Sequence, residues 1–344
     1  MEPYLQHEME AVQSRIIAAF AERVRSGACS KGHKVRAQMV SVALRAIGAT
    51  CELDGRPNPL YRAEGRYLRP LERQLEAFKR EDPPPQHKLA VPVTVVEHLA
   101  KVADVANTSR DCAISDLTCI AFYYLLRVGE YTFHSDKQKR RTRQFRARDV
   151  TFFDSRGIII PNNSPLSLLL QAKDATLHIS NQKNGTRGSL VNNEANDKRS
   201  CPVRALARRV HHIMSFGGPD DILGTYFTDH RRYKSHIVEK NINDALKRTV
   251  VALNLVASGF PPDAISSHSL RAGGAMAMHL NGVSPVTIRK QGRWSSDTFL
   301  MYIHEQISAF SKGVSRAMGT EIGWRNIAGP TLLNDPEEEH APAA

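Results

Sequence analysis

The spacing of apolar residues predicts helices at the start of the chain. Apolar side chains recur three and four positions apart over 16–24 and again over 35–47, and the pattern returns over 71–78 after Pro70. This spacing places the apolar side chains on one face of a helix. Residues 1–80 are therefore predicted to form a small helical bundle with many exposed arginines and lysines.

A run of prolines marks a boundary after this bundle. Pro83-Pro84-Pro85 lacks backbone donors and disfavours the helical conformation of each preceding residue, so it is predicted to lie in a linker. Helical spacing returns near 94–106 and 111–129. Within the latter, 117–126 is apolar on almost every face, which predicts a buried helix that ends in the charged Arg127.

Strand patterns follow. The runs 150–153, 157–160 and 176–180 are rich in β-branched and aromatic residues. Turn residues typical of hairpins occur at Asp154-Ser155-Arg156-Gly157 and Lys183-Asn184-Gly185. These runs predict a small antiparallel sheet of about three strands.

Further helices are predicted after the sheet. One begins at Pro202, a residue that suits the first helical position. The others begin near serines that can act as N-caps, namely Ser235, Ser267, Ser284 and Ser296. From Asp335 onward the chain has three consecutive glutamates and no apolar face, so this tail is predicted to be disordered.

Charge narrows the class of partner. The chain has 344 residues, with 47 Lys+Arg against 35 Asp+Glu, a net charge of +12 and 41% hydrophobic residues. Such a chain can bury a core, and its basic balance favours a polyanion such as nucleic acid, without telling DNA from RNA. It contains no apolar run of about 20 residues, so a membrane span is not expected, nor does its charged start predict secretion. The five scattered cysteines form no CxxC pair, which argues against a disulfide framework and a zinc site.

The segment His268-Ser269-Leu270-Arg271 is the first candidate for chemistry. Side chains three positions apart share a helix face, so the imidazole and the guanidinium can converge on one oxyanion. Gly273 and Gly274, just beyond, would permit close approach of another backbone. Taken alone, this pattern is a weak signal and is better explained by an ordinary exposed pair on a helix.

Two further segments change this interpretation. Downstream, the chain has Gly292-Arg293-Trp294-Ser295-Ser296-Asp297-Thr298-Phe299-Leu300-Met301-Tyr302, and upstream it has Leu125-Leu126-Arg127-Val128-Gly129-Glu130. With the His-x-x-Arg segment, they resemble the tyrosine recombinase (phage integrase) family, in particular integrases of eukaryotic mobile elements. That family has an arginine followed three residues later by an acid, a hairpin lysine, His-x-x-Arg, a His or Trp, and a nucleophilic tyrosine, in this order.

The resemblance implies a role for each matching residue. The implied catalytic residues are Arg127, Lys183, His268, Arg271, Trp294 and Tyr302, with Glu130 supporting Arg127. Lys173 and Arg187 lie near the same predicted hairpin and remain alternatives to Lys183. The other histidines show no metal-ligand spacing.

The resemblance also implies an architecture. The expected fold is mainly α with a small antiparallel β-sheet: a helical, SAM-like core-binding domain over 1–85 and an α+β tyrosine recombinase catalytic domain over 86–325. Residues 326–344 are the expected disordered acidic tail.

The implied chemistry is cleavage and rejoining of double-stranded DNA. Two arginines can stabilise the charge of the phosphoryl transition state, so no metal, cofactor or ATP is expected. Tyr302 would attack the phosphate and leave a 3′-phosphotyrosine, with His268 as base or proton relay and Lys183 as general acid. Members of this family act as tetramers on paired sites, and Tyr302 would act in its own active site or in a neighbour's.

Two other functions remain open on the sequence. A type IB topoisomerase uses the same set of side chains to relax supercoiled DNA. A mobile-element relic would keep only DNA binding.

A dense basic run precedes the predicted sheet. It comprises Lys137, Lys139, Arg140, Arg141 and Arg143, followed by Arg146 and Arg148. A solvated loop is one interpretation, and contact with DNA phosphates is the other. The run would also suit a nuclear import signal, so we expect a nuclear protein if the host is eukaryotic and a cytoplasmic one otherwise.

Overall fold

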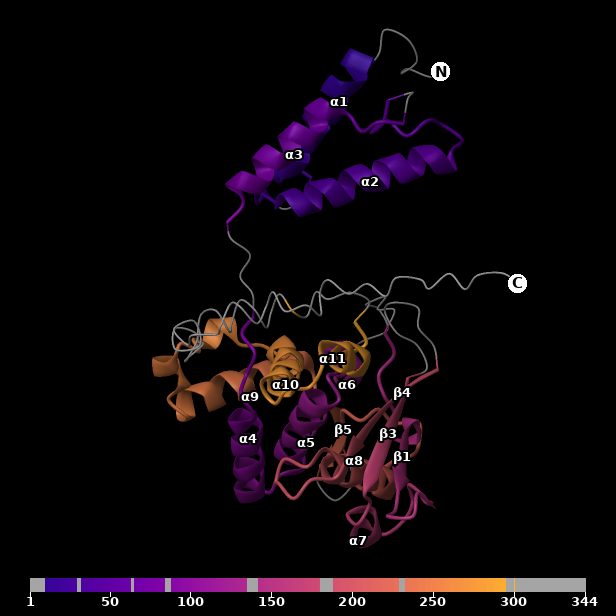
Figure 1. Cartoon of the computed structure of the whole chain (residues 1–344), viewed down its shortest axis with the longest axis vertical. Helices are drawn as coiled ribbons and strands as arrows, with labels where there is room; N and C mark the ends of the chain where they lie inside the picture. Colours follow the sequence, from indigo (N-terminus) through magenta and orange to yellow (C-terminus); the bar gives the residue numbers. More distant parts are fainter. Residues whose placement is uncertain are drawn as a thin grey trace, which may run out of the picture. The chain divides into compact units, whose positions relative to one another are not determined.

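The chain divides into two compact units, residues Met1–Gln86 and His87–Ala344 (Figure 1). The computed structural model describes residues 10–29, 32–62, 65–83, 88–134, 142–179, 188–228, 233–294 and 300. Within these ranges, none of the helices combines the length and the apolar character needed to cross a lipid bilayer.

The first unit is a small helical bundle, in agreement with the spacing of its apolar residues. Its described helices are α1 (Glu10–Arg25), α2 (Ala37–Leu53) and α3 (Arg69–Glu81). They bury a common apolar core that includes Ile17, Val24, Val40, Leu44, Leu71, Leu75 and Phe78. Burial of these side chains supplies the main favourable free energy of folding for this unit.

A buried arginine holds the three helices together. The Arg25 side chain donates hydrogen bonds to the carbonyl oxygens of Val35 (2.6 Å) and Phe78 (3.2 Å) and forms an ion pair with Asp82. The Asp82 carboxylate also accepts from the backbone N–H of Ala37 at the start of α2 (2.8 Å). The end of α3 is therefore fastened to both α1 and α2.

The second unit is mainly helical with a small antiparallel sheet, which confirms the predicted fold class. Its described helices are α4 (Val93–Ala106), α5 (Ser109–Tyr123), α6 (Val128–Tyr131), α7 (Leu166–Leu169), α8 (Pro202–Phe216), α9 (Glu239–Ala252), α10 (His268–Leu280) and α11 (Pro285–Gly292). Short 3-10 turns lie at Ala147–Asp149, Leu255–Ser258 and Pro262–Ala264.

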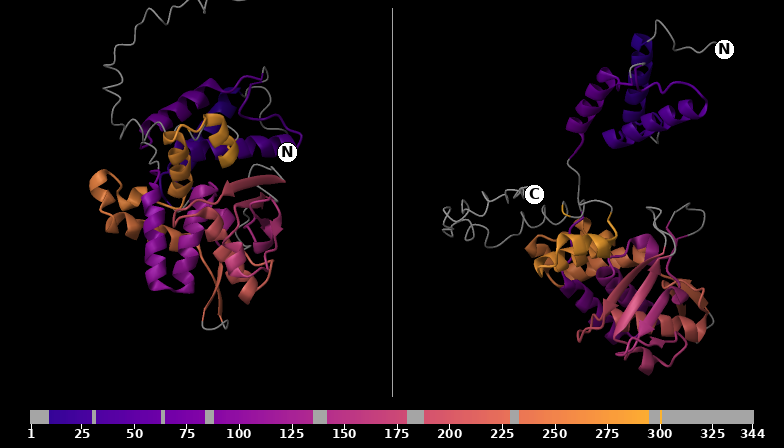
Figure 2. Two further views of the ribbon diagram at one scale, coloured as in Figure 1. Left: turned by 60° about the horizontal axis from the view of Figure 1, so that its bottom comes forward. Right: turned by 45° about the vertical axis from the view of Figure 1, so that its right-hand side comes forward.

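The sheet has one more strand than predicted. Within the described residues it has four strands in the order β2-β1-β3-β4: β1 (Val150–Phe153), β2 (Ile159–Ile160), β3 (Asp174–Ile179) and β4 (Ser189–Glu194). All neighbours are antiparallel, with Val150 opposite Leu177 and Leu177 opposite Val191. The prediction missed β4 because only two of its residues, Leu190 and Val191, are apolar, and only Val191 is buried. The sheet forms one side of the unit (Figure 2).

Helix α5 runs through the core of the second unit. Every residue from Ala113 to Phe122 is buried, and α5 contacts α4, α8 and α10. This confirms the predicted buried helix, but its predicted end was wrong. Helix α5 stops at Tyr123, because Leu125 adopts a left-handed conformation (φ 50°) that no α-helix can continue through. Arg127 is instead the N-cap residue directly before the separate helix α6.

The later helices agree with most of the predicted starts. Helix α8 begins at Pro202, and Ser284 caps α11 by accepting a hydrogen bond from the N–H of Thr287. Ser267 directly precedes α10. Ser235 was assigned wrongly: it lies in β6 (Tyr233–His236), which pairs with β5 (Thr225–Thr228). The predicted helix near Ser296 lies outside the described residues.

Candidate active site

A sharp corner after α5 places the first predicted arginine. The backbone N–H of Leu126 bonds to the carbonyl of Ala121 (3.0 Å), and the hydroxyl of the buried Tyr124 donates to the carbonyl of Ala175 in β3 (2.7 Å). These bonds and the left-handed Leu125 turn the chain so that Arg127 becomes the N-cap residue of a new helix, α6. Its side chain is 24% exposed, so it can reach a ligand at the surface.

Two glycines bring α10 against this corner. A Cβ at Gly274 would lie 2.1 Å from the carbonyl oxygen of Phe122, near the end of α5, and one at Gly273 would lie 2.3 Å from the carbonyl oxygen of Val91. Neither distance is compatible with a side chain, so only glycine permits this contact. The close backbone approach predicted for this pair is therefore present.

The second predicted arginine points from α10 into the corner. Arg271 donates from Nη1 to the carbonyl oxygen of Leu125 (2.6 Å) and from Nη2 to that of Gly292. Its guanidinium carbon lies 4.3 Å from the centre of the Trp294 ring. Arg271 and Arg127 are thus brought to one corner, but unequally: Arg271 is 2% exposed, whereas Arg127 is partly open to solvent.

Trp294 both packs in an apolar cluster and lies beside Arg271. Its ring packs against a small apolar cluster that includes Ala90, Ala272 and Ile288. A Cβ at Gly292 would lie 1.5 Å from a ring carbon, so glycine is required at that position for the ring to fit. Packing and a role beside Arg271 are therefore both compatible with this tryptophan, and the ring supports the guanidinium from one face.

Glu130 contacts Arg127 as predicted, but a different arginine holds it more strongly. Its side chain is 2% exposed and accepts the backbone N–H of Arg127 (2.8 Å). The Nη1 atom of Arg127 is 3.5 Å from Oε1, whereas Arg293 makes a two-pronged contact, Nη1 to Oε1 at 3.1 Å and Nη2 to Oε2 at 2.9 Å. No role was predicted for Arg293. The only signal for it in the sequence is its place between Gly292 and Trp294.

The electrostatics of the site favour a neutral histidine and an anionic ligand. His268 begins α10. Partial desolvation of its ring, followed by the positive charges of Arg271 and Arg127, lowers the pKa of His268. Desolvation also lowers the pKa of Arg127, and Arg293 acts in the same direction, while Glu130 opposes both. Two guanidinium groups, those of Arg127 and Arg293, contact the Glu130 carboxylate, and Arg271 lies at the same corner on the Leu125 carbonyl. The three positive charges exceed the one negative charge, which favours binding of a phosphate.

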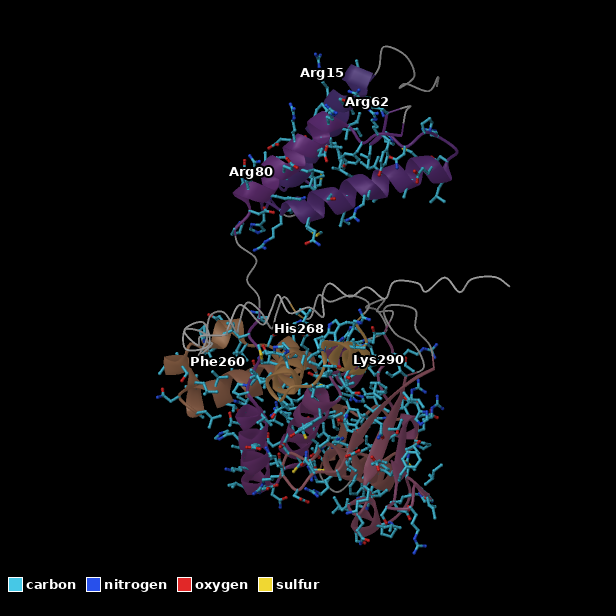
Figure 3. The ribbon with its side chains drawn as sticks, in the orientation of Figure 1. Arg15, Arg62, Arg80, Phe260, His268 and Lys290 are labelled. Carbon is cyan, nitrogen blue, oxygen red and sulfur yellow. The ribbon has the colours of Figure 1, made fainter. Side chains whose placement is uncertain are left out.

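The residues of this site come from one end of the second unit. Helices α6, α10 and α11 lie there, beyond the end of α5 (Figure 1). Figure 3 shows His268 at the start of α10 and Lys290 on α11 at the same end. The side chain of Gln291 also donates to the carbonyl of Asn192 in β4 (3.3 Å), which connects α11 to the sheet.

Several predicted site residues lie outside the described residues. These are Lys183, Tyr302, Lys137, Lys139, Arg140 and Arg141. Lys183 belongs to the segment 180–187, which joins the paired strands β3 and β4. Lys173 is exposed and precedes β3, so it lies at the opposite end of that strand from the connecting segment. Arg143 is exposed.

The last two arginines of the basic run have a protein partner. Arg146 and Arg148 both pair with Asp220, at 3.0 and 2.5 Å. All three side chains are largely exposed, so the pairs contribute little to stability. The run is therefore divided between residues with a carboxylate partner and the exposed Arg143.

No family model and no curated protein matches this chain. Among solved structures, the Tn1549 transposon integrase with a circular intermediate DNA is 13% identical, with a TM-score of 0.46 over 93% of this chain and 86% of that one. The XerH site-specific recombinase on a palindromic difH substrate is 12% identical, with a TM-score of 0.48 over 88% and 72%.

A third similar structure is a lambda integrase dimer on a core site. It is 13% identical to this chain, with a TM-score of 0.46 over 87% of this chain and 82% of that one. These three similar structures are of two integrases and a site-specific recombinase.

Proposed function

We propose that the protein is a site-specific DNA recombinase or integrase that cleaves and rejoins double-stranded DNA through a 3′-phosphotyrosine. The observation that carries this proposal is the convergence of Arg127 and Arg271 at the Leu125 corner. Arg271 is hydrogen-bonded to the Leu125 carbonyl itself, and Arg127 is the N-cap residue of helix α6, which follows. His268 lies three residues before Arg271 on the same helix, and the guanidinium of Arg271 lies over the ring of Trp294.

These groups suit phosphoryl transfer without a metal ion. Guanidinium groups stabilise the charge that develops on the non-bridging phosphate oxygens. In the proposed step, the Tyr302 hydroxyl oxygen bonds to phosphorus while its proton passes to the neutral ring of His268, whose pKa is lowered. The bond from phosphorus to the 5′ oxygen breaks, and Lys183 protonates that oxygen. Rejoining is the reverse, with a 5′ hydroxyl displacing Tyr302.

The proposed partner is duplex DNA, bound by several copies of the chain. The net charge of +12 favours a polyanion. Arg15, Arg62 and Arg80 of the first unit are exposed (Figure 3). Arg143 of the second unit is also exposed. Exposed arginines of this kind position a protein on DNA through phosphates without specifying sequence. We propose a homotetramer on paired sites, and a nuclear location in a eukaryotic host.

The experiment that tests this function traps the covalent intermediate. Purified protein is incubated with nicked duplexes of randomised sequence, and DNA that resists denaturation with the protein is sequenced. Wild-type protein should form a covalent adduct at a preferred sequence, and Tyr302→Phe should bind the same DNA without forming one. Tyr233→Phe, which changes an exposed tyrosine of β6, is the matched control and should retain adduct formation.

The other outcomes separate the alternatives. An adduct formed by Tyr302→Phe would remove that residue from its proposed role. Relaxation of plasmid DNA by the monomer, without sequence preference, would indicate a type IB topoisomerase. Tight DNA binding by wild-type protein that never forms an adduct would indicate a relic that only binds DNA.

A further inference from the structure

Arg293 occupies a backbone conformation that disfavours its residue type. It ends α11 with φ 56°, and the turn closes through hydrogen bonds from Arg293 to the carbonyl of Lys290 and from Trp294 to that of Arg289, both 3.0 Å. Glycine is the usual residue at such a left-handed helix end, and a side chain there costs about 1 kcal/mol. An arginine at this position therefore indicates that its side chain makes a contact that offsets this cost.

That contact is with the corner that carries Arg127. The Arg293 side chain is 6% exposed and forms the two-pronged contact with Glu130, and its Nη2 also donates to the carbonyl of Leu125 (3.2 Å). The same carbonyl accepts from Arg271. Paired, parallel contacts between a guanidinium and a carboxylate are among the strongest polar interactions in proteins.

The carboxylate of Glu130 consequently has little capacity left for the Arg127 side chain. Oε1 accepts from Arg293 at 3.1 Å, and Oε2 accepts both from Arg293 at 2.9 Å and from the backbone N–H of Arg127 at 2.8 Å. The Arg127 guanidinium reaches Oε1 only at 3.5 Å, the outer limit of a hydrogen bond. Two arginines thus compete for one buried carboxylate, and Arg293 has the better geometry.

We propose that Arg293 is a positioning residue: by occupying Glu130, it keeps the Arg127 guanidinium available for the phosphate of a DNA strand. This inference deepens the proposed function and rests on it for the identity of the ligand. Without the Arg293 side chain, a buried carboxylate would lack its main partner, a state that is strongly unfavourable. The partly exposed Arg127 side chain is near enough to turn inward and replace it.

A chemical test of this proposal needs no DNA. The full chain is treated with phenylglyoxal, which modifies accessible guanidinium groups, and modification of Arg127 is followed by mass spectrometry. In Arg293→Gly, which suits the left-handed backbone, Arg127 should react about tenfold more slowly than in wild type, because it is held by Glu130. Arg293→Gly/Glu130→Gln, which also neutralises the carboxylate, should restore the reactivity.

The controls exclude general effects of charge and folding. Lys290→Met removes one exposed positive charge from the same helix and should leave Arg127 as reactive as in wild type. Thermal unfolding of each variant shows whether it is folded, and Arg293→Met replaces Arg293→Gly if the glycine variant is not. Unchanged Arg127 reactivity in the folded single variant, or no recovery in the double variant, would overturn the proposal.

A second measurement relates this role to DNA cleavage. On a substrate that wild-type protein cleaves, Arg293→Gly should bind DNA within about twofold of wild type but form the adduct at least about tenfold more slowly, and Glu130→Gln should recover part of that rate. A loss of DNA binding equal to the loss of rate would contradict a positioning role. If wild-type protein forms no adduct, the proposed function fails, while the phenylglyoxal comparison still decides whether Arg293 controls Arg127.

Discussion

Arg271 donates a 2.6 Å hydrogen bond to the backbone carbonyl of Leu125, two residues before Arg127. The bond joins helix α10 to the corner at the end of α5, and it fixes where two residues far apart in the sequence lie relative to each other. The left-handed conformation of Leu125 turns its carbonyl away from the path of α5, where Arg271 and Arg293 can both reach it. The spacing of the candidate site is therefore set by backbone geometry as much as by the arginines themselves.

Arg271 is expected to support both stability and cleavage. Arg271→Met would leave the buried Gly292 carbonyl without this donor, so we expect a loss of about 2 kcal/mol in the free energy of unfolding, measured in urea. Adduct formation should fall at least about a hundredfold, because a donor to the transition state is lost. Arg271→Lys keeps the charge but not the planar fork and should be intermediate in both measurements. Wild-type stability in Arg271→Met would show that the carbonyl contacts contribute nothing.

Gly274 should tolerate no side chain. In Gly274→Ala the new Cβ would meet the Phe122 carbonyl at 2.1 Å, so α10 must move away from α5. We expect a loss of about 2 kcal/mol in the free energy of unfolding and slower adduct formation, since Arg271 would shift relative to Arg127. Gly218→Ala is the matched control, because a Cβ there meets no atom within 4 Å. Equal stability of the two variants would show that α10 is not packed as closely as described.

The lowered pKa of His268 predicts the pH dependence of cleavage. If the neutral ring accepts the proton of Tyr302, the adduct rate should rise as pH increases through this pKa, below about 6.5, and be level near neutrality. Because the pKa of His268 is lowered, the folded state binds a proton on this ring more weakly than the unfolded chain does. The contribution of the neutral ring to stability is therefore full above about pH 6.5 and lost as pH falls through that value.

NMR of the histidine rings can measure this pKa directly. Arg127→Met removes one of the positive charges that act on His268, so the pKa of His268 should rise toward its ordinary value but remain lowered by desolvation and Arg271. His212 is an internal control. Its pKa is lowered to about 4 by burial and by the charges of Arg209 and His211, which this substitution leaves in place. A pKa of His268 that does not change would show that Arg127 lies too far away to act on it.

A buried ion pair away from the site is expected to affect stability alone. Asp116 on α5 is buried, and Arg208 on α8 donates to its Oδ1 from Nε at 2.9 Å and from Nη2 at 2.6 Å. Arg208→Met leaves this buried carboxylate without its ion-pair partner, so we expect a loss of about 3 kcal/mol in the free energy of unfolding at pH 7. Arg208→Met/Asp116→Asn should recover most of that loss. Arg248→Met changes an exposed arginine of α9 and should alter stability by less than about 0.5 kcal/mol.

The sign of the pH effect gives a further check on Asp116. Burial raises the pKa of this carboxyl more strongly than Arg208 lowers it. A carboxyl whose folded pKa is raised disfavours the folded state once pH exceeds its unfolded value, and loss of Arg208 increases this effect. The stability deficit of Arg208→Met should therefore shrink as pH is lowered from 7 toward 4. A loss of stability that does not depend on pH would indicate that Arg208→Met removes packing contacts, and not that it leaves the Asp116 carboxylate unpaired.

Local sequence patterns determined the helices, most of the sheet and the order of the candidate residues. The apolar run of α5, the proline that begins α8 and the Ser284 cap all depend on neighbours within a few positions, so the sequence alone predicts them. The glycine pair predicted a close backbone approach, but its partners Val91 and Phe122 are far away in the sequence and were not predicted. The stretch around Ser235 was misassigned because a serine before a polar segment suits either a helix cap or a strand.

Tertiary structure alone decided the turn at Leu125 and the choice of partner for Glu130. Local spacing favours Arg127, three residues away, yet Arg293, separated by 163 positions, holds both carboxylate oxygens. That pairing exists because the glycines of α10 let it close on α5 and thereby bring the end of α11 to the corner. The strength of a contact depends on distance in space and on desolvation, and neither is encoded by position along the chain.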